Sequence, residues 1–200
     1  MKHFGLIDGI GSEFRHQGVS TFLEAPELAV PLFPPRPAVA TPRIGDSAVI
    51  RLAAALMPDS IVNGEGLRTV LWTQGCHLRC PGCQNPHTHD LNGGFVETVA
   101  SIKEKLAEIK MQRGITFSGG EPFLQAEVCT EIARFARTLG WDVWCFSGYT
   151  YEYLSLQEKH RAFLEQIDVL VDGPFIQAER DHTLKFRGSR NQRILRLREA

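Results

Sequence analysis

Short apolar segments recur along the second part of the chain, and their composition predicts buried strands. They lie at residues 70–72, 115–117, 143–146 and 169–171. Each is rich in β-branched or aromatic residues and is bounded by glycine or polar positions, as is typical of strands inside a sheet. The four segments therefore predict buried strands of a parallel sheet.

Amphipathic stretches separate these strands. Apolar residues recur three or four positions apart over 99–109 and again over 128–139, where Gly140 supplies a stop signal. A third helix is expected over 151–166. Alternating strands and helices predict an α/β fold whose parallel sheet is open or partly closed into a barrel.

Polar or glycine-rich motifs directly follow all four predicted strands. They are the cysteine loop after 70–72, SGGEP at 118–122, SGY at 147–149 and DGP at 172–174. Carboxyl ends of parallel strands lie at one rim of a sheet, where the active sites of such folds are found. The convergence of four motifs on that rim predicts an enzyme, with Tyr149 and Asp172 close to the site.

The beginning of the chain has a different composition. Six of its eleven prolines lie between Pro26 and Pro42, where each removes a backbone donor and favours extended structure. We expect residues 1–46 to form an irregular extension with little core of its own. Residues 47–200 are expected to form a single folded domain.

Charge and hydropathy limit the partners of this protein. The chain has a net charge of −1, which gives no general attraction to nucleic acid or to anionic membranes. No apolar run approaches the roughly 20 residues that span a bilayer, and the first residues lack the apolar core of a signal peptide. We therefore expect a cytoplasmic protein with reduced thiols and with no nucleic-acid or membrane partner.

Three of the five cysteines form the pattern C-x3-C-x2-C, as Cys76, Cys80 and Cys83. Three thiolates on one loop suit a cubane iron–sulfur cluster that keeps one iron open. They also suit a structural zinc site, if a nearby histidine provides the fourth ligand. Unligated thiols are the third interpretation, and the spacing alone leaves all three open.

The order of the motifs resembles the radical S-adenosylmethionine superfamily, where C-x3-C-x2-C follows a first strand and GGE follows a second. The resemblance implies a partial (β/α) barrel in which Cys76, Cys80 and Cys83 hold a [4Fe-4S] cluster whose open iron binds S-adenosylmethionine. The residues expected to bind that cofactor are Gly82, Gln84, Ser118, Gly119, Gly120 and Glu121. The GGE glycines would let the backbone approach the ligand, and the Glu121 carboxylate would accept hydrogen bonds from its ammonium group.

Longer segments narrow the resemblance to the activating proteins of anaerobic ribonucleoside-triphosphate reductase. The most specific are VDGPF at 171–175 and FRGSRNQRI at 186–194. This resemblance implies an enzyme that cleaves S-adenosylmethionine reductively to a 5′-deoxyadenosyl radical, which generates a glycyl radical on the reductase. It also implies an electron donor such as flavodoxin, and no catalytic residues beyond those that bind the cluster and the cofactor.

Two other functions remain open. One is a different radical S-adenosylmethionine enzyme, either a pyruvate formate-lyase activase or a 7-carboxy-7-deazaguanine synthase-like enzyme. The other is a zinc-binding module without catalysis.

Several reactive or charged residues are interpreted structurally. Cys129 and Cys145 fall in a predicted helix and a predicted strand, and we expect both in the core. His89 is expected to be a surface or packing residue. The basic positions near the C-terminus alternate with Ile194 and Leu195, which predicts an edge strand or a docking surface for the reductase.

Overall fold

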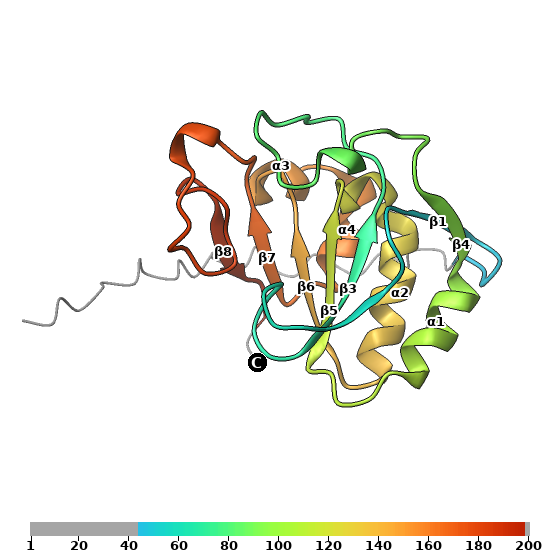
Figure 1. Cartoon of the computed structure of the whole chain (residues 1–200). Coiled ribbons are helices and arrows are strands. Elements are labelled where there is room, and N and C mark those ends of the chain that lie inside the picture. The colour runs from blue at the N-terminus through green and yellow to red at the C-terminus, as the bar shows by residue number, and fades with distance from the viewer. Residues whose placement is uncertain (1–43, 199–200) are drawn as a thin grey trace, which may run out of the picture.

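Eight strands form one mixed sheet in the computed structural model, which describes residues 44–198 (Figure 1). The strands are β1 (Val49–Leu52), β2 (Met57–Ser60), β3 (Arg68–Thr73), β4 (Phe95–Thr98), β5 (Gly114–Gly119), β6 (Asp142–Phe146), β7 (Val169–Asp172) and β8 (Arg193–Arg196). The α-helices are α1 (Val99–Glu108), α2 (Ala126–Thr138), α3 (Tyr151–Ser155) and α4 (Glu158–Leu164). There are also three short 3-10 helices, η1 (Pro86–Thr88), η2 (Pro122–Gln125) and η3 (Gln177–Glu179), within residues 44–198.

The strand order is β4-β1-β3-β5-β6-β7-β8, with β2 paired to β3. The four strands predicted from the sequence, β3, β5, β6 and β7, are parallel neighbours. Antiparallel strands extend the sheet on both sides, and β8 is the edge strand expected near the C-terminus. The mixed α/β sheet with a parallel centre is therefore confirmed. The antiparallel strands β1, β2 and β4 were not predicted, because each has only four residues and because β2 and β4 are largely exposed.

The two faces of the sheet have different coverings. Alternate strand residues such as Phe117, Val143 and Cys145 belong to the main core, which they share with α1, α2 and α4. The intervening Trp144 points to the other face, where a smaller cluster includes Phe186 from the C-terminal segment. This period-two alternation leaves the face opposite the helices available to form a site.

The predicted helix over 151–166 is two helices, so that prediction was wrong in its extent. Leu154 of α3 and Phe163 of α4 are both fully buried, whereas Leu156 between them is 83% exposed. On one continuous helix Leu154 and Phe163 would be about two and a half turns apart and would point in opposite directions. The break at Gln157 lets both side chains enter the same core.

The other predicted helices are confirmed. Thr98 caps the start of α1 by accepting a hydrogen bond from the Ser101 amide, and Gly140 follows α2 with a positive φ of 78°. The predicted extension over residues 1–46 lies outside the described residues, except at its end. No helix within residues 44–198 is long and apolar enough to cross a membrane.

Candidate active site

A cavity of about 690 Å³ lies at the carboxyl ends of the parallel strands. Loops after all four strands line it, and they contribute Cys76 after β3, Ser118 at the end of β5, Ser147 after β6 and Gly173 after β7. The volume falls within the range of about 300–1,000 Å³ that is typical of ligand sites. The structure thus brings together the four motifs that the sequence placed at one rim.

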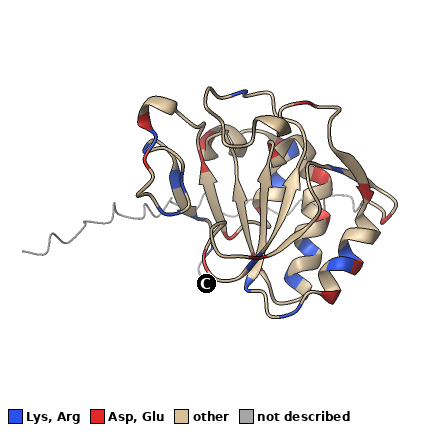
Figure 2. Cartoon of the chain, viewed as in Figure 1, with Lys and Arg blue, Asp and Glu red and all other residues tan. Residues whose placement is uncertain are grey.

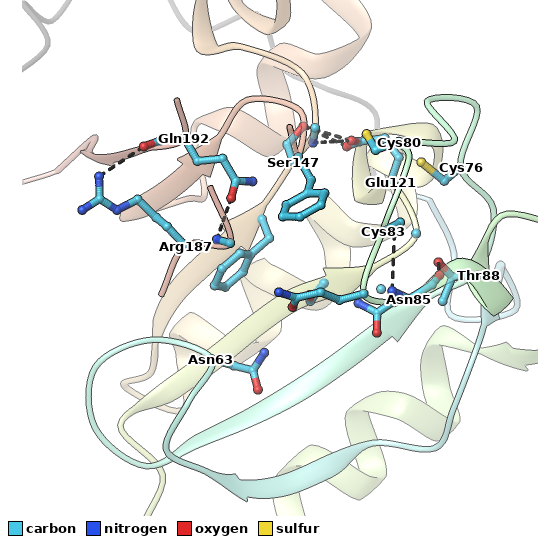
Figure 3. A pocket seen from close by; sticks show the side chains of 18 of the residues that line it. Asn63, Cys76, Cys80, Cys83, Asn85, Thr88, Glu121, Ser147, Arg187 and Gln192 are labelled. Atoms are coloured by element: carbon cyan, nitrogen blue, oxygen red, sulfur yellow. Dashed lines mark hydrogen bonds between the residues drawn. The ribbon is translucent and has the colours of Figure 1, made fainter. Parts of the chain in front are cut away.

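The cysteine loop arches over one side of this cavity (Figure 3). Cys76, Cys80 and Cys83 all line the cavity as free, half-buried thiols. The buried Thr88 closes the loop, because its hydroxyl donates to the Asn85 carbonyl and its own carbonyl accepts from the Gly75 amide. The loop therefore presents three accessible thiols, which are soft metal ligands, on a backbone held by hydrogen bonds.

The donor set fits an iron–sulfur cluster. Within residues 44–198, no group of three histidine, cysteine or carboxylate side chains is gathered for a single metal ion. Three thiols distributed along the wall of a cavity suit a cubane cluster, in which each thiolate binds a different iron. Backbone amides also point to the sulfurs, since Asn85 N donates to Cys83 Sγ at 3.4 Å (Figure 3). Such N–H···S bonds stabilise the negative charge of cluster ligands.

The two glycines of the GGE loop allow close contact between backbones. A Cβ on Gly120 would lie 2.3 Å from the Gly75 carbonyl oxygen, and Gly119 has a φ of 101° that L residues rarely adopt. Two backbone hydrogen bonds join the GGE loop to the end of β3 and the residues that follow it. The Gly120 amide donates to the Thr73 carbonyl and the Glu121 amide donates to the Gly75 carbonyl, each at 2.8 Å. The GGE loop is thereby attached to the start of the cysteine loop.

The Glu121 carboxylate connects a third loop to this pair. It lines the cavity but is only 1% exposed, and it accepts hydrogen bonds from the Gly148 amide at 2.9 Å and the Phe123 amide at 3.1 Å. The Ser147 hydroxyl also donates to this carboxylate (Figure 3). The structure therefore gives Glu121 a bracing role between the loops after β5 and β6, beside the predicted contact with an ammonium group.

This buried carboxyl makes stability depend on pH. Burial raises the pKa of Glu121 to about 7 from 4.5, and the hydrogen bonds from Phe123, Gly148 and Ser147 oppose the rise. Because the folded state then binds the proton more tightly than the unfolded chain, the free energy of unfolding falls by about 3 kcal/mol as pH rises from about 4.5 to about 7.

We expect this part of the pH dependence to be missing in Glu121→Gln. Urea denaturation of both proteins at about pH 4.5 and about pH 8 measures it, because the cost of the substitution is then largest at the lower pH. An equal loss of stability with pH in the two proteins would contradict the raised pKa.

The remaining predicted cofactor residues fall on or beside the cavity. Gln84 lines it, whereas Gly82 is not among the lining residues and forms an exposed turn with a φ of 73° beside Gln177. His89, which was expected to be a surface or packing residue, is half-buried and lines the cavity. Its backbone carbonyl accepts a hydrogen bond from the Cys76 amide at 3.4 Å, so its position follows from the closure of the loop.

Asp172 has a structural role. It is fully buried, accepts from the Tyr151 amide at 2.7 Å and forms an ion pair with Arg193 at 2.5 Å. Tyr149 stacks on Tyr153 with ring centroids 4.8 Å apart. Neither Tyr149 nor Asp172 is among the residues that line the cavity.

Sequence reasoning missed much of the cavity wall. Trp72 and Phe146 line it from the ends of β3 and β6. They alternate with the core residues Leu71 and Cys145, so the period of two along each strand would have placed them on the cavity face. The wall from the C-terminal segment, which includes Phe186, had no such local signal.

Comparison with known proteins identifies the family. Residues 62–195 match the family described as "4Fe-4S single cluster domain". The chain is 37% identical over 147 residues to the anaerobic ribonucleoside-triphosphate reductase-activating protein of Vibrio cholerae. The aligned segment covers 70% of this chain and 94% of that protein. The chain belongs to this family of activating proteins.

Other relatives with the same name extend the comparison. The protein of Escherichia coli K12 is 36% identical, with 70% of this chain and 96% of the relative covered. That of phage T4 is 32% identical, with 70% and 90% covered. Among solved structures, QueE from Escherichia coli is similar with a TM-score of 0.41 and 13% identity, over 51% of this chain and 53% of QueE. Membership in the activating-protein family rests on the sequence relatives.

Family membership gives the cavity its chemistry. A [4Fe-4S] cluster and S-adenosylmethionine are the cofactors of these radical enzymes, as the sequence resemblance implied. The three thiols and the GGE loop meet in one cavity, so the site has a place for each cofactor.

Proposed function

We propose that this chain generates a glycyl radical on an anaerobic ribonucleoside-triphosphate reductase. The observation that carries the proposal is the convergence of three free thiols and the GGE loop on one cavity. The relatives named for this activity are covered almost completely by the aligned segment, which supports transfer of the activity as a whole.

Each part of the cavity has a task in this proposal. Cys76, Cys80 and Cys83 hold the cluster, which together with bound S-adenosylmethionine supplies one-electron radical chemistry. The backbone of Gly119 and Gly120 orients the amino-acid part of that cofactor. The other residues that contact S-adenosylmethionine are Ser118, Glu121, Gln84 and Gly82. No side chain is required to act as a general acid or base, so the chain contributes binding, orientation and the exclusion of water.

The proposal includes the electron donor, the cellular compartment and the partner protein. The electron comes from a carrier protein such as flavodoxin, in the cytoplasm, and neither nucleic acid nor a membrane takes part. Lys and Arg are mixed with Asp and Glu over the helices and loops in the view of Figure 2, which supports a protein partner over a polyanion. The catalytic domain spans residues 47–200 as a partial (β/α) barrel, and residues 1–46 form an extension to it.

Electron paramagnetic resonance tests this function. The reconstituted, reduced protein is mixed with S-adenosylmethionine and the anaerobic reductase, and a glycyl radical is expected on the reductase only in the complete mixture. A radical on pyruvate formate-lyase but not on the reductase would instead identify a different activase. Turnover of a small molecule without a protein partner would identify a synthase of the deazaguanine type.

A further inference from the structure

The segments DGPF at 172–175 and FRGSRNQ at 186–192 form one structural unit. We call residues 173–192, between β7 and β8, the double loop. The side-chain oxygen of Gln192 accepts hydrogen bonds from the amides of Gly188 at 2.8 Å and Ser189 at 3.2 Å. Its side-chain nitrogen donates to the Gly173 carbonyl at 3.0 Å. One amide side chain thus joins the DGPF turn to the FRGS turn.

Further hydrogen bonds hold the same two turns together. Asn191 Nδ2 donates to the Pro174 carbonyl at 2.8 Å, and the Ile176 amide donates to the Ser189 hydroxyl at 3.2 Å. Arg187 lines the cavity, and its guanidinium group donates to the Gln192 carbonyl (Figure 3). The double loop is therefore a braced wall.

This wall faces the cavity with both apolar and basic residues. Phe175, Leu184 and Phe186 of the double loop line the cavity, and so do Lys185 and Arg187. In Figure 3, Gln192 lies on the side of the cavity away from Cys76. Ile61 and Val62 also line the cavity and are 72% and 71% exposed, so apolar side chains continue from the cavity to the surface.

Phe186 is held in an unfavourable backbone conformation. Its φ is 55°, a region that costs a bulky L residue about 1 kcal/mol or more. Its ring packs edge-on against Trp144, which is 2% exposed, with centroids 5.4 Å apart. Two residues after Phe186, the Gly188 amide donates a hydrogen bond to the Gln192 side chain. Packing and these hydrogen bonds together keep the Phe186 ring at the cavity wall.

A substrate glycine has no side chain that an enzyme could recognise. An enzyme that acts on one glycine of a protein must therefore recognise the residues around it, through a surface next to its reaction site. The double loop is such a surface, because it is braced and brings Phe175, Leu184 and Phe186 to the cavity.

We propose that the double loop is the wall that selects the protein substrate, with Phe186 as the specificity-determining contact and Gln192 as the residue that positions it. This inference rests on the proposed function. The three apolar side chains of the wall fit an extended segment of the partner protein that carries apolar side chains and enters past Ile61 and Val62.

Steady-state kinetics with the anaerobic reductase as the varied substrate test the proposal. Phe186→Leu and Gln192→Ala are expected to raise KM for the reductase about tenfold, with kcat changed less than about twofold. The dissociation constant of the complex with the reductase, measured by calorimetry, is expected to rise by the same factor. Gln192→Glu keeps the acceptor for the Gly188 and Ser189 amides but loses the donor to the Gly173 carbonyl, so only part of the affinity is expected to return.

Two further measurements and one control variant complete the design. Iron content, and cleavage of S-adenosylmethionine without the reductase, are expected to match the parent protein in every variant, which separates this inference from failure of the proposed function. His182→Ala is the matched control, since His182 is exposed on the double loop and does not line the cavity. An unchanged KM for the reductase in Phe186→Leu would overturn the proposal, as would a rise confined to KM for S-adenosylmethionine.

Discussion

Replacing Cys80 with alanine is expected to give a colourless protein that holds no [4Fe-4S] cluster and generates no radical. Two thiolates are too few to retain a cubane cluster of about four irons in this loop. The other cysteines cannot substitute for the lost ligand. Cys129 and Cys145 are fully buried, and burial raises the pKa of both thiols far above the ordinary value. Iron analysis, the visible spectrum after anaerobic reconstitution and the glycyl-radical signal measure the effect.

Cys145→Ala is the matched control for this substitution. Cys145 lies in β6 within the main core, so its loss is expected to cost about 1–2 kcal/mol of stability and to spare the cluster. Full iron content in Cys80→Ala would contradict the assignment of Cys80 as a ligand. Loss of the cluster in both variants would indicate a general folding defect.

Replacing Arg68 with alanine is expected to lower the free energy of unfolding by about 3–5 kcal/mol. The Arg68 side chain is completely buried at the start of β3 and pairs with Asp142 of β6 at 2.5 Å. It also donates to the Thr116 hydroxyl at 2.7 Å and to the Ile115 carbonyl at 2.8 Å, so it joins three parallel strands. Its removal takes one donor from each of these acceptors and opens a cavity beside Trp144.

Arg113→Ala tests whether this cost comes from burial. Arg113 pairs with the same carboxylate at 3.2 Å, but its side chain is 53% exposed. Solvent screens such a pair, so we expect a cost below about 1 kcal/mol. Urea denaturation compares the two variants. Equal losses would show that the ion pair with Asp142, and not the buried network, accounts for the effect.

The parallel centre of the fold was predictable because its signals are local. The strands β3, β5, β6 and β7 are runs of β-branched and aromatic residues, and α1 and α2 carry apolar residues at helical spacing. Short edge strands such as β2 have no comparable pattern, because most of their side chains are exposed. The division of α3 from α4 was also hidden, since the demand that Leu154 and Phe163 share one core arises only in the folded chain.

The sequence by itself determined the chemistry of the site. The spacing of Cys76, Cys80 and Cys83 is a property of neighbouring residues, and the order of the cysteine and GGE motifs can be read directly along the chain. Only the tertiary structure decided how the cavity is walled. Glu121 meets Ser147 from 26 positions away, and Gln192 meets Gly173 from 19. The side chains of such pairs carry no sign of their partners, because hydrogen-bond geometry exists only after the sheet has brought its loops to the same rim.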